Sequence, residues 1–178
     1  MGDFLVKIQN MDKIKGIGVL PTDTLYGLVC SALDEKAVEK LYQLKERNLK
    51  KPFIILISSL KDLDLFKVKL PEKVKEFWPG KVSIVLPCAS EKFTYLHKGL
   101  NSLAFRWPKD EFLRKILLKT GPLVAPSCNK EGEKPAETIK QAKEYFPNLD
   151  FYINKGVLKG KPSKIIKIED GKVIVLRK

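Results

Sequence analysis

The run PFIILI, from Pro52 to Ile57, restricts the fold more than any other segment because it contains no polar residue. A strand with one face in solvent alternates apolar and polar residues, whereas a continuous apolar run is typical of a strand buried on both faces. The run therefore predicts an inner strand of a sheet that other segments cover on both sides.

Helix patterns and strand patterns alternate along the rest of the chain. Asp34 can cap a helix whose apolar residues are Val38, Leu41 and Tyr42, and DEFLRKILLKTG predicts an amphipathic helix that ends at Gly121. The other predicted elements are strands within residues 16–21, 28–30, 81–87, 102–108, 122–129 and 151–154, and helices within residues 4–14, 71–80 and 137–146.

The final segment, KIIKIEDGKVIVLRK, has two alternating stretches around Asp170 and Gly171, which predicts a β-hairpin. Strands and helices that alternate and are followed by a hairpin indicate an α/β fold with a mixed sheet. The length of 178 residues suits one domain, and we expect that domain to span residues 1–178.

The composition argues against several classes of protein. Hydrophobic residues make up 44% of the chain, and no apolar run approaches the ~20 residues of a membrane helix. Because no segment resembles a secretory signal, we expect a soluble cytoplasmic protein with no membrane partner. Three scattered cysteines, Cys30, Cys88 and Cys128, and a single histidine argue against a disulfide framework, a metal site and a Ser-His-Asp triad. We interpret the cysteines as small buried thiols.

The net charge is strongly positive. Lys and Arg total 34 against 21 Asp and Glu, which gives +13. Such a surface favours anionic partners such as RNA, nucleotides or phosphates. The lysines are nevertheless spread along the whole chain, and lysine-rich surfaces also suit life at high temperature. Charge alone therefore supports an anionic partner only weakly.

Polar residues interrupt the apolar run VLPTDTLYGLVC, from Val19 to Cys30. One interpretation is a turn, in which Pro21 ends a strand and Thr22 to Thr24 cap the next element. The other is a pocket wall that presents polar side chains, including that of Tyr26, to a ligand. The segment by itself leaves both interpretations open.

Two more polar groups accompany apolar strands. Lys45, Arg47, Lys50 and Lys51 precede the strand of PFIILI, and Ser127 and Asn129 follow the strand of PLVAPSCN. Ligands of α/β proteins gather in the crevice beyond the carboxyl ends of strands, so one crevice could gather all three polar groups.

Two basic residues occupy unexpected positions. Lys45 falls on the apolar side of its predicted helix, where either the helix frays, the side chain reaches back to water, or the ammonium serves an anion site. Arg106 lies within an apolar strand and either clamps an anion in the crevice or points to solvent. Because the sequence has no P-loop and no dinucleotide fingerprint, any nucleotide would be bound through Lys, Arg, hydroxyl groups and Mg²⁺.

Six motifs together resemble the Sua5/YciO/YrdC family, and its threonylcarbamoyl-AMP synthase branch most closely. They occur in the family's order between Pro21 and Arg177 and read PTDTLYGL, LKERNLKKPF, FWPG, LAFRWP, PLVAPSCNKEG and GKPSKII. The resemblance implies a twisted mixed sheet with flanking helices and a central basic cavity. It also implies a nucleotidyltransferase that forms threonylcarbamoyl-AMP and pyrophosphate from L-threonine, bicarbonate and ATP with Mg²⁺. The product would serve the t6A modification of tRNA, reached directly or through a partner threonylcarbamoyl-transferase complex.

The family pattern also implies roles for individual residues. The catalytic residues would be Lys45, Arg47, Ser127 and Asn129. Threonine would contact Thr24, Arg106, Ser127 and Ser163, and the nucleotide would contact Arg47, Lys51, Ser102, Asn129 and Arg177.

The chain departs from the family pattern at three places. Leu56 stands where longer members have a histidine near threonine, Lys164 replaces a usual threonine, and the terminal Arg-x-Gly is reduced to Arg177-Lys178. We expect these changes to weaken the outer ligand contacts.

Two other functions are compatible with the sequence. A non-catalytic RNA-binding module of the same fold would bind tRNA with a strong dependence on salt and would not turn over ATP. A carbamoyl-adenylate activity like that of the related domain in hydrogenase maturation proteins would require carbamoyl phosphate. That domain normally accompanies zinc-finger and acylphosphatase segments, which are not visible in this sequence.

Overall fold

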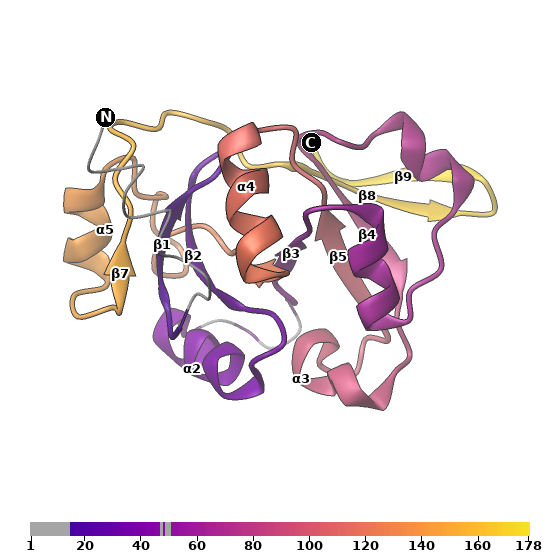
Figure 1. Ribbon diagram of the computed structural model, residues 1–178, viewed down its shortest axis with the longest axis horizontal. Helices are drawn as coiled ribbons and strands as arrows, with labels where there is room; N and C mark the ends of the chain where they lie inside the picture. Colours follow the sequence, from indigo (N-terminus) through magenta and orange to yellow (C-terminus); the bar gives the residue numbers. More distant parts are fainter. Residues whose placement is uncertain (1–14, 47, 49–50) are drawn as a thin grey trace.

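The computed structural model describes residues 15–46, 48 and 51–178, and these residues form a nine-stranded mixed sheet (Figure 1). The strand order is β7-β1-β2-β6-β3-β5-β4-β8-β9. The strands are β1 (Gly18–Pro21), β2 (Tyr26–Ser31), β3 (Ile54–Leu56), β4 (Val82–Pro87), β5 (Ser102–Arg106), β6 (Leu123–Val124), β7 (Phe151–Tyr152), β8 (Lys164–Glu169) and β9 (Lys172–Arg177). This arrangement confirms the predicted α/β fold with parallel and antiparallel pairs.

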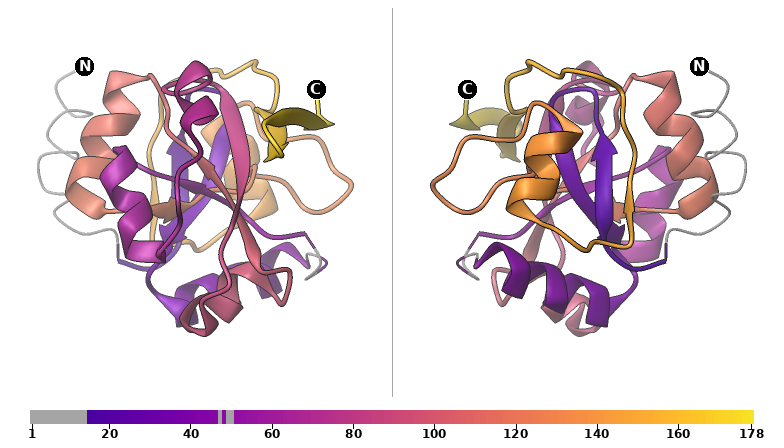
Figure 2. Two further views of the ribbon diagram at one scale, coloured as in Figure 1. Left: turned by 90° about the vertical axis from the view of Figure 1, so that its right-hand side faces the viewer. Right: turned by 90° about the vertical axis from the view of Figure 1, so that its left-hand side faces the viewer.

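The helices surround this sheet. The α-helices are α2 (Glu35–Lys45), α3 (Thr94–His97), α4 (Glu111–Thr120) and α5 (Ile139–Tyr145), and the 3₁₀ helices span Leu60–Phe66, Glu72–Glu76 and Glu91–Phe93. Figure 2 shows α4 on one side of the molecule and the hairpin of β8 and β9 on the other.

Strand β3 is the predicted inner strand. It pairs in parallel with β5 and antiparallel with β6, so both of its edges are covered. Ile55 and Leu56 are completely buried, and they belong to two different apolar clusters. Leu56 packs with Leu113 and Ile116 of α4, which fills one side of the sheet. The run is therefore apolar throughout because its successive side chains pack into apolar clusters on opposite faces of the sheet.

Helix α2 begins as predicted and extends further than a frayed helix would. The Asp34 carboxylate caps it by accepting a hydrogen bond of 3.0 Å from the Ala37 amide. Val38, Leu41 and Tyr42 are buried against the sheet. The last helical residue is Lys45, which is buried as well, so the interpretations in which this end frays or reaches water are wrong.

The C-terminal hairpin is also confirmed. Glu169 lies opposite Lys172, and Asp170 and Gly171 both have positive φ, of 48° and 71°. Two positive φ values in succession belong to the tight turn that matches the twist of two antiparallel strands, and Asp-Gly adopts it readily.

Other local predictions differ from the structure. Residues 71–80 contain only the short 3₁₀ helix Glu72–Glu76, because Pro79 ends the segment and the Gly80 amide bonds to the carbonyl of Trp107. The helical segments Leu60–Phe66 and Glu91–His97 were not predicted, because their few turns carry no clear periodicity. The predicted helix within residues 4–14 lies outside the described residues.

The three cysteines are free and buried, as the sequence predicted. Within the part of the chain that the structure describes, no helix has the length and apolar character needed to cross a membrane. In the same part, no cluster of three His, Cys, Asp or Glu side chains is arranged to hold a metal ion.

Candidate functional site

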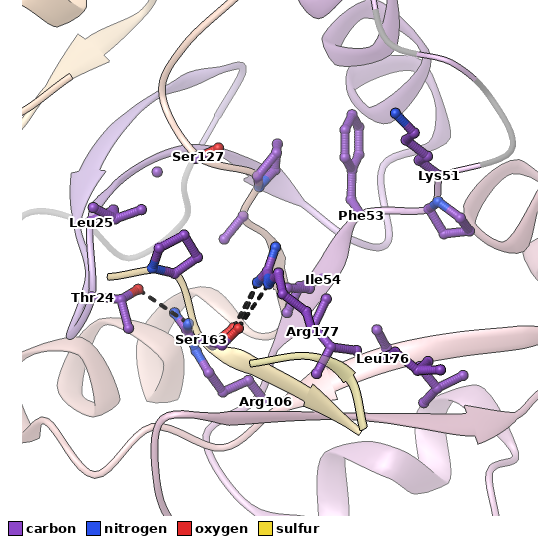
Figure 3. A pocket seen from close by; sticks show the side chains of 18 of the residues that line it. Thr24, Leu25, Lys51, Phe53, Ile54, Arg106, Ser127, Ser163, Leu176 and Arg177 are labelled. Atoms are coloured by element: carbon purple, nitrogen blue, oxygen red, sulfur yellow. Dashed lines mark hydrogen bonds between the residues drawn. The ribbon is translucent and has the colours of Figure 1, made fainter. Parts of the chain in front are cut away.

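A pocket of about 550 Å³ lies where the turn after β1, the start of β3, strands β4 and β5, the loop after β6 and the C-terminal hairpin converge (Figure 3). Seven of the residues predicted for the site line it: Thr24, Lys51, Ser102, Arg106, Ser127, Ser163 and Arg177. Each of the three polar groups noted in the sequence therefore contributes at least one residue to the lining of one cavity.

The turn after β1 combines both interpretations of VLPTDTLYGLVC. The Thr22 hydroxyl donates to the carbonyl of Leu25 at 2.7 Å and accepts from the amides of Thr24 and Leu25, so it builds the turn. The turn presents the Thr24 hydroxyl to the pocket, and Tyr26 forms part of the wall.

Tyr26 also holds the segment that leads to the hairpin. Its hydroxyl donates to the carbonyl of Gly156 at 2.8 Å and accepts from the amide of Lys155 at 2.9 Å. Further along, a Cβ atom on Gly160 would lie 1.8 Å from the carbonyl oxygen of Thr24. The segment crosses the turn so closely that only glycine fits there.

Arg106 at the end of β5 is buried in the pocket wall, with only 4% of its surface exposed. Its Nη1 donates to the Thr24 hydroxyl at 3.2 Å, and its Nη2 lies 3.1 Å from Oδ1 of Asp23. Burial lowers the pKa of Arg106, the Asp23 carboxylate opposes that change, and the charge of Arg177 adds to it. Of the two interpretations of Arg106, the crevice position is correct and the solvent position is wrong.

The loop after β6 is fixed against β2 by its backbone. The Leu28 amide bonds to the carbonyl of Pro126, and the Cys128 amide bonds to the carbonyl of Tyr26. Within the loop the Ser127 hydroxyl donates to Oδ1 of Asn129 at 2.6 Å. The Ser127 side chain thus has a fixed position at the pocket wall.

Lys45 supports this loop from behind. Its ammonium group donates to the carbonyls of Ser127 and Asn129 at 2.6 and 2.7 Å and also contacts Oδ1 of Asn129 at 3.3 Å. Asn129 in turn donates through Nδ2 to the carbonyls of Lys130 and Glu133. Neither Lys45 nor Asn129 lines the pocket. Both act on it through Ser127, and their predicted contact with substrate stays a prediction.

The C-terminal hairpin closes one side of the pocket. Arg177 donates through Nε and Nη2 to the carbonyl of Ser163, at 3.0 and 2.7 Å (Figure 3). The Ser163 and Ser83 hydroxyls lie 2.8 Å apart. Lys164 is exposed and does not line the pocket. Leu56 is a core residue and does not line it either.

The remaining predicted residues lie at the rim or outside the described residues. Ser102 begins β5 and lines the pocket, and Lys51 does so while forming an ion pair of 3.0 Å with Glu131. Arg47 lies outside the described residues, so its predicted role stays a prediction.

Four cationic side chains line the pocket, those of Lys51, Arg106, Lys167 and Arg177, and no Asp or Glu is among the lining residues that the structure describes. Three of these four cations form ion pairs with carboxylates that do not line the pocket. The pairs are Lys51 with Glu131, Arg106 with Asp23, and Lys167 with Glu169. The predicted basic character of the cavity therefore stays a prediction.

Two residues of the site escaped assignment from the sequence. Asp23 was predicted only as a member of the turn or of the polar wall, with no partner assigned, and Ser83 looked like an ordinary strand residue. The signal for Asp23 was a carboxylate between two apolar runs, which requires a buried partner.

Cys128 gives the folded chain a measurable dependence on pH. Burial raises the pKa of its thiol to about 12 from 9.0, and the charge of Lys45 opposes the change. Between these two values the unfolded chain loses a proton that the folded chain keeps. The free energy of unfolding therefore falls as pH rises above about 9, by up to about 1.4 kcal/mol per pH unit for this thiol.

Urea unfolding of Cys128→Ala and of the unchanged protein, in reductant at about pH 8 and about pH 10, tests this prediction. The variant should lose less stability than the unchanged protein between the two pH values. Equal losses of unfolding free energy in the two proteins would contradict the raised pKa of the Cys128 thiol.

Comparison with known proteins identifies similar chains. A family model for Sua5/YciO/YrdC, described as telomere recombination, matches residues 13–178. The threonylcarbamoyl-AMP synthase of Marinobacter nauticus is 34% identical over 164 residues, which cover 88% of this chain and 86% of that protein. The threonylcarbamoyl-AMP synthase of Pyrococcus abyssi is 32% identical over 164 residues, which cover 88% of this chain and 48% of that protein.

A solved structure matches as well. The crystal structure of Pyrococcus abyssi Sua5 complexed with L-threonine superposes with a TM-score of 0.84 at 29% identity, over 99% of this chain and 54% of that one. The chain thus spans about half the length of the Pyrococcus abyssi protein and most of the Marinobacter nauticus protein.

Proposed function

Since the chain belongs to the Sua5/YciO/YrdC family, we propose that it is a threonylcarbamoyl-AMP synthase, a nucleotidyltransferase that uses L-threonine, bicarbonate and ATP. The observation that carries the proposal is the convergence of Thr24, Arg106, Ser127 and Arg177 on one pocket. The names of the relatives in Marinobacter nauticus and Pyrococcus abyssi support it.

The proposed reaction has two bond-forming steps. The amine of threonine forms a C–N bond with the carbon of bicarbonate, and water leaves. An oxygen of the resulting carbamate then attacks the α-phosphorus of ATP, and the bond from that phosphorus to the bridging oxygen breaks so that pyrophosphate departs. Bicarbonate, the carbamate and ATP all carry negative charge, so the protein must mainly neutralise charge and align the groups.

The pocket offers groups suited to these tasks. Arg106 presents a planar guanidinium group, which pairs well with a carboxylate, and the hydroxyls of Thr24 and Ser127 lie in the same cavity. We assign Arg106 to the carboxylate of threonine and the two hydroxyls to its remaining polar atoms. Ser163 would add a contact to threonine from the hairpin side.

The nucleotide would occupy the rest of the pocket. Lys51 and Arg177 supply positive charge for phosphate oxygens, with Ser102 in the same pocket lining and Arg47 as a further predicted contact. Among the described residues, those that line the pocket include no carboxylate, and the carboxylates next to the lining pair with Lys51, Arg106 and Lys167. Mg²⁺ would therefore enter as the complex with ATP, held by phosphate oxygens and water.

Proton transfer would not require a side-chain base. The pocket lining, as far as the structure describes the chain, includes no histidine and no carboxylate, so the amine proton would pass to water or to a substrate oxygen. The cytoplasm, where ATP and tRNA occur, is the proposed location. The tRNA, reached directly or through a partner transferase complex, would be the destination of the product.

Pyrophosphate release from ATP and Mg²⁺, with bicarbonate and with or without L-threonine, tests the proposal in the full chain. Release that depends on threonine is the expected result. Release that depends on carbamoyl phosphate instead would replace the proposal by the carbamoyl-adenylate reaction. No release, combined with salt-dependent binding of tRNA, would replace it by the RNA-binding function.

A further inference from the structure

We propose that Asp23 is a positioning residue, which holds the Arg106 guanidinium in the orientation that receives the carboxylate of the amino-acid substrate. The inference rests on the proposed function and adds to it a residue that the reaction scheme does not use. Asp23 does not line the pocket, so it acts only through Arg106.

The Asp23–Arg106 pair is deeply buried. Each side chain exposes 5% of its surface, and Oδ1 of Asp23 lies 3.1 Å from Nη2 of Arg106. Neither carboxylate oxygen of Asp23 has an aligned hydrogen bond within the described residues. Burying a carboxylate with so few hydrogen bonds costs desolvation free energy, which an ion pair can offset. Within the described part of the chain, the ion pair of Asp23 is the one with Arg106.

Asp23 and Thr24 form a clamp of two consecutive residues. The Thr24 hydroxyl accepts a hydrogen bond from Nη1 of Arg106, while the Asp23 carboxylate lies next to Nη2. The turn built by Thr22 directs these neighbouring side chains to two different nitrogens of one guanidinium group. Contacts at two nitrogens fix the rotation of the planar group, which a single contact cannot do.

The clamp leaves the right donors for a carboxylate. A guanidinium group has five N–H donors, and Nε of Arg106 is buried without a partner in the described structure. With one donor of Nη1 used by Thr24 and one of Nη2 facing Asp23, one donor on each of these nitrogens remains. Two adjacent N–H groups match the two oxygens of a carboxylate.

Asp23 also limits repulsion between the arginines of the pocket. The positive charge of Arg177 lowers the pKa of Arg106, after the larger effect of burial, and both side chains line the cavity. Without Asp23, Arg106 would lose the carboxylate that the structure places beside it, and nothing in that ion pair would offset the positive charge of Arg177. Arg106 would then be free to turn away from its present position.

The test compares Asp23→Asn with Asp64→Asn in the full chain. Asp64 is exposed, so the control removes the same charge from a site outside the pocket. The KM for threonine should rise about tenfold in Asp23→Asn, the effect of one misaligned charge-assisted hydrogen bond, while the KM for ATP changes less than about twofold. Asp64→Asn should leave both values unchanged.

A double substitution separates positioning from general damage. If Asp23 acts only through Arg106, adding Asp23→Asn to Arg106→Gln should not weaken threonine binding any further in isothermal titration calorimetry. Should Asp23→Asn fail to fold, Asp23→Glu keeps the charge but displaces it, and the same selective rise in the KM for threonine is expected.

The inference is wrong if Asp23→Asn leaves the KM for threonine unchanged or raises the KM values for threonine and ATP equally. It is also wrong if the two substitutions weaken threonine binding independently. These failures differ from a failure of the proposed function, in which the unchanged protein neither binds threonine nor releases pyrophosphate in its presence.

Discussion

Arg106→Gln is expected to lower kcat/KM for threonine-dependent pyrophosphate release by about a hundredfold. The substitution removes the planar cation assigned to the carboxylate of threonine, and the loss of hydrogen bonds to a charged group costs about 3 kcal/mol. It also leaves Asp23 buried without the ion pair that both side chains form at 5% exposure. The free energy of unfolding should therefore fall as well, by about 3–5 kcal/mol.

Steady-state kinetics and urea unfolding of the same preparation measure both effects. Lys109→Gln is the matched control, because Lys109 is an exposed cation three positions away that should tolerate the loss of charge. If the Arg106→Gln protein kept its affinity for threonine, Arg106 would not be a threonine-binding residue. A protein that loses affinity without losing stability would show that Asp23 has found another partner.

Lys45→Met is expected to lower the free energy of unfolding by about 2–5 kcal/mol. Methionine keeps an unbranched apolar side chain of similar length but removes the ammonium group that donates to the carbonyls of Ser127 and Asn129, and each lost hydrogen bond to a charged group costs about 1.5–3 kcal/mol. The Ser127 carbonyl keeps the Asn129 amide as a donor. Because the loop that carries Ser127 would shift, kcat/KM should fall for threonine and ATP together.

Lys40→Met provides the comparison on the same helix, since Lys40 is exposed and its loss should change stability very little. Chemical denaturation gives the stabilities, and pyrophosphate release gives the activities. If Lys45→Met were as stable as Lys40→Met and yet inactive, Lys45 would have to contact substrate directly. That result would support the catalytic role that the family pattern implies.

Much of the fold could be predicted because its elements are specified locally. The apolar run at β3, the Asp34 cap of α2 and the Asp170-Gly171 turn each depend on residues a few positions apart. The short 3₁₀ helices were missed because a few residues cannot establish a period.

The site was less predictable because its contacts join distant parts of the sequence. The ammonium of Lys45 reaches carbonyls of the loop after β6, and Asp23 reaches across to Arg106. The sequence marked each of these residues as a charge in an apolar setting. Such a position predicts that a buried partner exists, but only the packed chain identifies the partner.

The two-residue strand β6 has a consequence for how the pocket comes into existence. Val124 pairs with Cys30 on one side and with Ile55 on the other, so this strand joins the part of the sheet around β2 to the part around β3. The pocket draws its walls from both parts. A chain in which these sequence-distant pairings have not yet formed has no pocket, and contacts of this kind form slowly. Ligand capture is therefore a property of the fully assembled sheet, and a bound substrate would stabilise the whole chain against unfolding rather than a single loop.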